Sequence, residues 1–346
     1  MTDKEKKAFT QWPGTNKFYC SGRIMMGPDN HRAFITFFLI LCPEIVYIAS
    51  PSVYFIKEHD NPGPFLVNLF FTILSLFFLY RCATKNPGFI PKQKPPFAWG
   101  PSGALTIQEL MEDSFKPKEV PCEGNLVRLK YCVTCNIIRP PRASHCSDCG
   151  VCVEKFDHHC PWLGNCVAKR NYREFIAFLI STSMLDISTM GFCIYHIADV
   201  WTGEGSGTSA FASAMQQTGP SVALLLYGFL AFWFVVGLTM FHMYLLFTGQ
   251  STHEKIKGNF KIMGENPYHR GNYINNCMKV IYGPTPPQHF NLRAPAAKRE
   301  DHIELSHSKL AMVAGANNNE EKAAGTISPS EIHIVRENSP DGHDSR

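Results

Sequence analysis

Residues 132–166 read CVTCNIIRPPRASHCSDCGVCVEKFDHHCPWLGNC, a stretch that holds ten side chains of the types that bind zinc. They are Cys132, Cys135, Cys146, Cys149, Cys152, Cys160 and Cys166, together with His145, His158 and His159. Two closed tetrahedral zinc sites need eight ligands, so one thiol and one imidazole are left over. A thiol beside an imidazole is the smallest set of groups that supports nucleophilic catalysis. The stretch therefore predicts a zinc-stabilised domain that contains a reactive cysteine.

The spacing of the cysteines supports the zinc interpretation. Cys132 and Cys135 form one Cys-x-x-Cys pair, Cys146 and Cys149 form a second, and Cys152 follows after two more residues. Two thiolates at this spacing can reach one tetrahedral ion from a tight turn. The alternative is that the cysteines are reduced and packed as small apolar residues. It does not fit a segment in which Lys, Arg and Asp alternate with the cysteines.

Counting alone does not say which thiol and which imidazole are spare, but the tetrapeptide Asp157-His158-His159-Cys160 narrows the choice. A catalytic thiol needs a neighbouring base, and the base is usually oriented by an acid. Asp157, His158 and Cys160 supply these three groups within four residues. In an extended segment His158 and Cys160 point to the same side, whereas His159 points to the other side, toward a metal.

Four apolar runs lie outside this stretch, and each has about the 20 residues that a helix needs to cross a bilayer. They cover residues 33–56, 64–82, 174–198 and 221–247. We therefore predict an α-helical polytopic membrane protein with four transmembrane helices and a zinc-binding domain between the second and third. Asp186 lies near the middle of the third run, where a charge is costly. We favour a packing or hydrogen-bonding role for it between helices, with a functional role as the alternative.

The distribution of Lys and Arg predicts the orientation in the membrane. Residues 1–32 carry six of them and residues 83–173 carry thirteen, whereas the loop at 199–220 carries none. The positive-inside rule then places both termini and the central segment in the cytosol. Cysteines in the cytosol stay reduced, so a disulfide framework is excluded. The net charge of +4 comes largely from residues beside the spans, which favours contact with the lipid bilayer and argues against a nucleic-acid partner.

The chain divides into seven segments on these criteria. They are a cytosolic N-terminal segment (1–32), the first two transmembrane helices (33–82), a cytosolic linker (83–131), the zinc domain (132–173), the last two transmembrane helices (174–248), a folded cytosolic segment (249–283) and a disordered tail (284–346). The linker is rich in Pro and Gly, and a short helix is expected within it at residues 106–115.

The chain resembles the DHHC family of protein S-acyltransferases. The resemblance covers residues 132–166 without a gap, continues through CPWLGNCVAKRNYREF (160–175), and includes the four-span topology. Within that family the chain is most similar to the Golgi and endoplasmic reticulum subgroup related to the yeast Ras palmitoyltransferase. The segments that carry this closer similarity are RLKYCVTC, RPPRASHCSDC and NPYHRGNYINNC.

The resemblance implies a role for each of the ten ligand-type side chains. One structural zinc ion would be held by Cys132, Cys135, His145 and Cys152, and the other by Cys146, Cys149, His159 and Cys166. Cys160 would be the nucleophile, His158 its base and Asp157 the residue that orients the base. Palmitoyl-CoA, or another long-chain acyl-CoA, would be the acyl donor. The acceptors would be cytosolic cysteines of membrane-associated proteins, and some relatives need an accessory subunit.

Further residues are expected to contact the donor. Trp162 and side chains of the third helix would line a cavity for the acyl chain. By charge and by similarity to the family, Arg139 and Arg142 would contact the phosphates of the coenzyme, although solvated basic surface is an equally good interpretation of both. Cys277 is a candidate for acylation, although an inert cysteine is more common at such a position.

Two motifs differ from the pattern of the family. An Asp-Pro-Gly becomes Asn86-Pro87-Gly88, which loses a charge, and a Thr-Thr-x-Glu becomes Ser251-Thr252-His253-Glu254, which keeps both hydroxyls. We expect these changes to alter fine tuning and not to remove activity. Asn276 matches an asparagine that packs against the active region in the family, and a helix cap is the alternative.

Two other functions compete with this interpretation. The first is a zinc-stabilised membrane scaffold without chemistry, which would have no use for a thiol spared from the metals. The second is a zinc transporter, which would need carboxylates and histidines gathered inside the spans. Glu44, Asp186, His196 and His242 are too scattered along the sequence to support it.

Overall fold

The computed structural model describes residues 7–93, 118–122, 125–205, 207–258, 266–269 and 271–294. All of them belong to one compact unit. The short helix expected at 106–115 and the tail beyond Ala294 lie outside the described residues.

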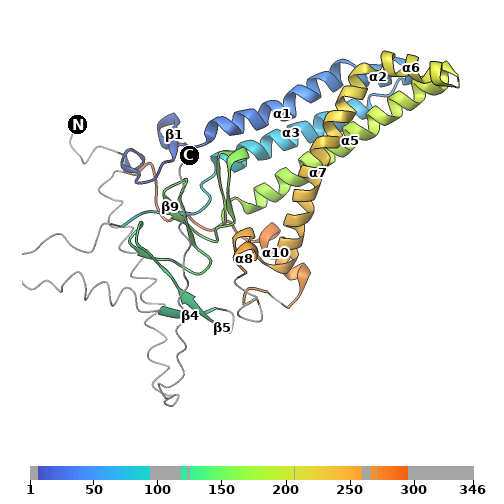
Figure 1. Ribbon diagram of the computed structural model, residues 1–346. Helices are drawn as coiled ribbons and strands as arrows, with labels where there is room; N and C mark the ends of the chain where they lie inside the picture. The colour runs from blue at the N-terminus through green and yellow to red at the C-terminus, as the bar shows by residue number, and fades with distance from the viewer. Residues whose placement is uncertain are drawn as a thin grey trace, which may run out of the picture. The chain divides into compact units, whose positions relative to one another are not determined.

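Within the described residues, four helical stretches are long and apolar enough to cross a membrane (Figure 1). The first, Asn30–His59, is divided at Ser50 into α1 (Asn30–Ala49) and α2 (Pro51–His59), and the others are α3 (Gly63–Thr84), α5 (Tyr172–Glu204) and α7 (Gly219–Thr248). Each stretch contains one of the four apolar runs, and the cysteine-rich segment lies between the second and the third. The predicted fold class of a four-span helical membrane protein is therefore confirmed.

The loop expected at 199–220 is mostly helical. It contains the end of α5 and a further helix, α6 (Thr208–Gln217). The sequence of α6, TSAFASAMQQ, has three alanines, and alanine has the highest intrinsic helix propensity. The absence of Lys and Arg in this segment was a signal for its side of the membrane and carried no information about its backbone conformation.

The helices pack around α5, which contacts both α3 and α7. One cluster of buried apolar side chains joins Leu79 of α3, Phe175 and Leu179 of α5, and Leu246 of α7. The same cluster includes Cys160 and Leu163 from the cysteine-rich segment. The core of the helical bundle therefore extends directly to the tetrapeptide.

The cysteine-rich segment is built from short antiparallel strands. β3 (Phe89–Ile90), β9 (Val151–Val153) and β8 (Ser144–Cys146) form a three-stranded sheet, β6 (Tyr131–Cys132) pairs with β7 (Ile137–Ile138), and β10 (His158–Cys160) pairs with β11 (Asn165–Val167). Outside it, β4 (Lys118–Cys122) pairs with β5 (Asn125–Leu129), and β1 (Lys17–Tyr19) pairs with β2 (Ile24–Met26). Such short strands have little stability by themselves, which fits a domain that relies on metal ions.

The N-terminal segment and a C-terminal segment lie together against these strands. The backbone N–H groups of Ala8 and Phe9 donate to the carbonyls of Ala294 and Leu292, both at 2.9 Å. The ring of Trp12 lies 4.7 Å from that of Phe290, measured between centroids. Residues 284–294, expected to belong to the disordered tail, therefore fold back onto the cysteine-rich segment. The side chains of Phe290 and Leu292 enter its core.

Candidate active site

The tetrapeptide lies on a tight hairpin. His158 pairs with Val167, His159 with Cys166 and Cys160 with Asn165. Neighbouring side chains on a strand point to opposite faces, so His158 and Cys160 share one face and His159 lies on the other. The turn after Cys160 ends at Gly164, which has a φ of 59°. An added Cβ there would lie 2.8 Å from the Cα of Asn30, so only glycine allows the hairpin to pack against the start of α1.

The structure brings together two groups of possible metal ligands, and each group contains three thiols and one imidazole. The first consists of Cys132, Cys135, His145 and Cys152, and the second of Cys146, Cys149, His159 and Cys166. Within each group all the ligand atoms lie within 4.8 Å of one another. Three thiolates and one imidazole are a donor set that suits a tetrahedral zinc ion. The two groups can each hold a metal ion, and they have the same members as the ligand sets that the family resemblance implies.

The histidines of both groups face their thiols through the same ring atom. Nδ1 of His145 lies 3.2 Å from Sγ of Cys135. Nδ1 of His159 lies 3.5 Å from Sγ of both Cys149 and Cys166. The groups are interleaved in the chain, since Cys146 and Cys149 of the second group lie between His145 and Cys152 of the first.

Asp157, His158 and Cys160 lie together, outside both groups. Oδ2 of the buried Asp157 accepts a hydrogen bond from Nδ1 of His158 at 2.7 Å. His158 also forms a hydrogen bond with Cys160. Cys160 is a buried cysteine that belongs to neither metal group. The acid, the imidazole and the thiol are therefore linked in the order that the sequence analysis expected.

Asp157 and His158 each stabilise the charged form of the other. Burial alone would lower the pKa of His158, but its hydrogen bonds with Asp157 and Cys160 raise that pKa to about 10. Burial acts on Asp157 in the opposite direction and would raise its pKa, yet the hydrogen bond from His158 and its positive charge bring that pKa below the usual range. Asp157 and His158 therefore form a charged, hydrogen-bonded pair beside the Cys160 thiol.

The segment that follows α7 holds the carboxylate of Asp157 in place. The backbone N–H of Thr252 donates to Oδ1 at 2.9 Å, and its hydroxyl donates to Oδ2 at 2.7 Å. Thr252 is the first residue of α8 (Thr252–Lys257), whose N-terminus is capped by Ser251 and Glu254 in a reciprocal pair of hydrogen bonds. In the altered Ser251-Thr252-His253-Glu254 motif, the Ser251 hydroxyl therefore accepts from the backbone of Glu254, and the Thr252 hydroxyl donates to Asp157.

Replacing Thr252 with valine is expected to slow formation of the acyl-enzyme about ten- to hundredfold. The change keeps the shape of the side chain but removes one of the hydrogen bonds to the Asp157 carboxylate. A hydrogen bond to a charged group contributes about 1.5–3 kcal/mol, and each 1.4 kcal/mol lost from a transition state is about tenfold in rate. The measurement is the rate at which palmitoyl-CoA labels the purified protein, determined by quench flow.

Thr248→Val is the matched control for this variant. The hydroxyl of Thr248 donates to the carbonyls of Tyr244 and Leu245 within its own helix and does not reach Asp157. The control should therefore label at the wild-type rate. Equal rates for Thr252→Val and the wild type would show that the hydroxyl does not help to orient the carboxylate.

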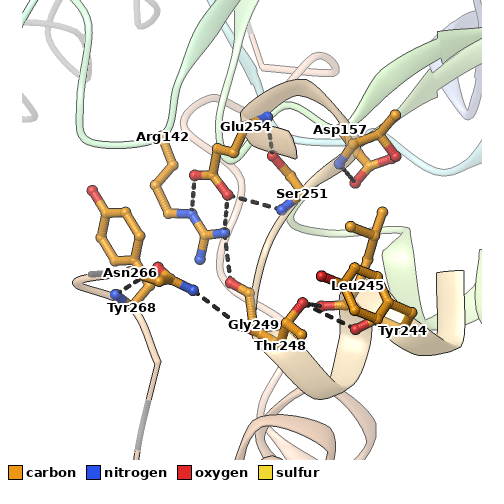
Figure 2. Close-up of polar contacts among 11 residues, drawn as sticks. Arg142, Asp157, Tyr244, Leu245, Thr248, Gly249, Ser251, Glu254, Asn266 and Tyr268 are labelled. Carbon is orange, nitrogen blue, oxygen red and sulfur yellow. Dashed lines mark hydrogen bonds and ion pairs between the residues drawn. The ribbon is translucent and has the colours of Figure 1, made fainter. Parts of the chain in front are cut away.

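Arg142 fastens the same segment to the cysteine-rich domain. Figure 2 shows its guanidinium group between the carboxylate of Glu254 and the carbonyl of Gly249. Nε donates to Oε1 of Glu254 at 2.6 Å, and Nη2 donates to Oε2 of Glu254 and to the Gly249 carbonyl at 2.9 Å. The guanidinium carbon also lies 4.3 Å from the centre of the Tyr268 ring. This structural role of Arg142 was not expected from the sequence.

A cavity of about 290 Å³ opens beside Cys160, between helices α1, α5 and α7. Near the cysteine it is lined by Trp162, Leu163 and Phe175, and farther along it by Leu179 and Leu238. The hydroxyl of Thr36 in α1 donates to the carbonyl of Trp162 at 2.7 Å, which fixes this part of the wall. The cavity is predominantly apolar and has the volume of a small ligand pocket.

Comparison with known proteins agrees with this geometry. Residues 126–259 match the family model described as DHHC palmitoyltransferase. The chain is 37% identical to palmitoyltransferase ZDHHC9 of Danio rerio over 350 residues, covering 99% of this chain and 88% of the relative. The same enzyme of Homo sapiens is 38% identical, covering 83% and 80%. The probable protein S-acyltransferase 6 of Arabidopsis thaliana is 36% identical, covering 85% and 72%.

This chain belongs to the DHHC palmitoyltransferase family. The membership confirms the resemblance noted in the sequence. In this DHHC protein both motifs that differ from the family pattern form hydrogen bonds. Those of Ser251 and Thr252 are described above. Oδ1 of Asn86 accepts from the backbone N–H groups of Gly88 and Phe89, at 2.9 and 3.0 Å, so the turn after α3 needs an acceptor there and not a charge.

Asn276 of this DHHC protein lies in α10 (Tyr273–Tyr282) and is buried. Its side-chain amide donates to the carbonyl of Phe247 at 2.8 Å and lies 2.7 Å from Nδ1 of His269. It therefore ties α10 to the end of α7, as expected of a packing residue, and it does not cap the helix, which is capped by Asn272.

The residues expected to contact the donor lie in different places. Trp162 lines the cavity and is 48% exposed, so it can meet both the cavity and its surroundings. Arg139 donates from Nη2 to the carbonyl of Tyr131 at 3.3 Å, on the cysteine-rich domain. Arg142 is engaged with Glu254. Contact of these two arginines with the coenzyme stays a prediction.

His242 was considered in the sequence only as part of a transporter, and the structure places it beside the tetrapeptide. It is buried in α7, and its ligand atoms lie within 4.8 Å of those of Asp157 and His158. Nδ1 of His242 lies 3.3 Å from the hydroxyl of Tyr172. A histidine within an apolar helix was the signal in the sequence, but its partners come from distant parts of the chain.

Proposed function

We propose that the chain transfers a long-chain acyl group, typically palmitoyl, from acyl-CoA to Cys160 and then to a cysteine of a membrane-associated protein. One observation carries this proposal. Cys160 is the cysteine of the 132–166 stretch that lies outside both metal groups, and it sits beside His158 at an apolar cavity between the helices. Membership of the DHHC palmitoyltransferase family supports the same reaction.

In the first step Cys160 attacks the thioester carbonyl of the acyl-CoA. The bond between Sγ of Cys160 and the acyl carbon forms, and the bond between that carbon and the sulfur of CoA breaks. His158 holds the proton that the Cys160 thiol gives up, and it passes this proton to the departing CoA sulfur. Asp157 keeps Nδ1 of His158 occupied by a hydrogen bond, so the other ring nitrogen faces the reacting sulfur.

In the second step the thiol of the protein substrate replaces Cys160. Its sulfur bonds to the acyl carbon, the bond to Cys160 breaks, and His158 passes the substrate's proton to Cys160. A thioester replaces a thioester in both steps, so the overall reaction needs no energy source besides acyl-CoA. The neighbouring cavity would hold the acyl chain throughout.

We also propose that the two metal groups hold structural zinc. Cys132, Cys135, His145 and Cys152 would bind one ion, and Cys146, Cys149, His159 and Cys166 the other. Four protein ligands leave no position for substrate, and bound zinc would stiffen the backbone of β8, β9 and β10. Arg139 and Arg142 would meet the phosphates of CoA, and Trp162 would cover the acyl chain near Cys160.

The protein would work as a multi-pass protein of the Golgi or endoplasmic reticulum membrane, with both termini and the cysteine-rich domain in the cytosol. The excess of Lys and Arg in the segments assigned to the cytosol supports this orientation. An accessory subunit is a candidate partner, by similarity to members of the family.

The acyl-enzyme itself tests the proposed function. Purified protein incubated with palmitoyl-CoA should gain one palmitoyl mass, and hydroxylamine should remove it, because hydroxylamine cleaves thioesters. Peptide mass spectrometry should place the adduct on Cys160. An adduct confined to another cysteine, such as Cys277, would contradict the assignment of the nucleophile, and its absence from Cys277 would show that this cysteine is inert.

A further inference from the structure

The end of the cavity farthest from Cys160 is polar. Along α5 the lining residues run from Phe175, whose ring lies 5.5 Å from that of His158, to Thr182, Asp186 and Thr189. At 1.5 Å of rise per residue, Thr182 lies about 10 Å and Asp186 about 16 Å beyond Phe175. Glu44 of α1 joins them in the wall. A cavity that is apolar beside the thiol therefore ends among two carboxyl groups and two hydroxyls.

Some of these polar groups have partners within the protein. Oε1 of Glu44 accepts from the hydroxyl of Thr189 at 3.1 Å, and Oε2 lies 3.5 Å from the amide nitrogen of Asn68. That amide nitrogen donates to the Thr189 hydroxyl at 2.7 Å. Glu44, Asn68 and Thr189 thus form a buried network in which each side chain is hydrogen-bonded to the other two.

Asp186 and Thr182 differ from that network. Oδ2 of Asp186 and the hydroxyl oxygen of Thr182 are buried, and among the described residues neither has a hydrogen-bond partner. The two side chains are four residues apart on one helix, which places them on the same face, about 5–6 Å apart. Opposite them lies Gly228 of α7, where an added Cβ would approach Cγ of Met190 to 2.7 Å and Oδ1 of Asp186 to 3.1 Å. Glycine at this position makes room for both side chains.

Unpaired polar atoms in such a place need an explanation. An ionisable residue within a membrane span is costly and commonly marks a functional site, and buried polar groups are nearly always hydrogen-bonded. A ligand hydroxyl suits both atoms, because it can donate to the carboxyl oxygen of Asp186 and accept from the hydroxyl of Thr182. A charged group would be a poor ligand, since it would be desolvated in an apolar cavity.

We propose that this end of the cavity binds the hydroxyl group of a hydroxylated long-chain acyl-CoA, with Asp186 and Thr182 as its hydrogen-bond partners. The inference rests on the proposed function and specifies its donor. A carbon–carbon bond of about 1.5 Å advances an extended chain by roughly 1.3 Å. If the thioester lies level with Phe175, the hydroxyl is about 8–13 bonds farther along the chain, in the distal half of a chain of palmitoyl length.

Competition between two donors tests this inference. Purified protein is mixed with equal amounts of palmitoyl-CoA and 12-hydroxypalmitoyl-CoA, and the two acyl masses on Cys160 are compared at short times. We expect the hydroxylated chain to load up to about tenfold faster, which is within the range for one added hydrogen bond. In a parallel mixture, 3-hydroxypalmitoyl-CoA should have no such advantage, because its hydroxyl would lie beside Cys160.

Three variants separate hydrogen bonding from packing. Asp186→Leu should lose the preference for the 12-hydroxy chain, whereas Asp186→Asn, which can still hydrogen-bond, should keep it. Thr202→Val is the matched control, because Thr202 lies on the same helix, does not line the cavity, and donates to the carbonyl of Asp199. The ratio of two products from one sample is insensitive to how much of a variant is folded.

Equal loading of the two chains by the wild type, or an unchanged ratio in Asp186→Leu, would overturn the inference and leave the proposed function intact, because Cys160 would still be acylated. Failure of both donors to label Cys160 would overturn the proposed function, and the inference with it.

Discussion

Replacing Cys160 with serine is expected to abolish acyl transfer, with the rate of acyl-enzyme formation falling at least about 1,000-fold, as when a covalent nucleophile is removed from other enzymes. A serine hydroxyl would occupy nearly the same space beside His158, but it loses its proton far less readily than a thiol does and attacks a thioester more slowly. The measurements are labelling by palmitoyl-CoA and transfer of the label to a protein substrate.

The zinc content of this variant decides between an enzyme and a scaffold. Cys160 lies outside both metal groups, so Cys160→Ser should bind as much zinc as the wild type and melt at a similar temperature. Cys277→Ser is the matched control, because Cys277 is a partly buried cysteine outside both groups, and it should retain activity. A hydroxylamine-sensitive adduct of equal size in Cys160→Ser would rule out the proposed mechanism.

Replacing Cys146 with serine is expected to remove activity by a different route. Cys146 belongs to the second metal group, and His145, directly before it in the chain, belongs to the first. Zinc binding contributes about 10–16 kcal/mol to the folding of small zinc domains. We therefore expect the zinc content to fall from two ions per chain to one or fewer, with a large drop in melting temperature and no acyl-enzyme.

Cys20→Ser is the control for zinc binding, because Cys20 is exposed and belongs to neither group. It should keep two zinc ions and full activity. Zinc is measured by inductively coupled plasma mass spectrometry on protein of known concentration. Two ions and normal labelling in Cys146→Ser would show that this thiol is not a ligand.

The features that were predictable from the sequence are those whose signals are local. Each span is one continuous apolar run, and about 20 apolar residues are sufficient to indicate a transmembrane helix. The Cys-x-x-Cys pairs place two thiols in one turn, so their grouping hardly depends on the rest of the fold. The alternation of His158, His159 and Cys160 follows from the pleat of a single strand.

The features that were missed depend on packing between distant segments. Arg142 meets Glu254 and Asp157 meets Thr252 because the segment after α7 returns to the cysteine-rich domain. Neither contact has a signature in either segment alone. The sequence favoured a packing or hydrogen-bonding role for Asp186 between helices, and only the packing of α5 against α7 brings it to the end of the cavity. Residues 284–294 have a polar composition typical of a tail. Phe290 is one of their few side chains that pack in the core of the cysteine-rich segment.

The backbone hydrogen bonds from Ala8 and Phe9 to Ala294 and Leu292 have a consequence for biosynthesis. A chain leaving the ribosome presents its N-terminal segment first, yet the partner of that segment is made only after all four spans. Phe290 and Leu292 pack in the same core as Cys146, Cys149 and Cys166, so this core is incomplete until residue 294 has emerged. Maturation of the protein is therefore a late event, and a stop codon shortly before Phe290 should yield an inserted but immature chain.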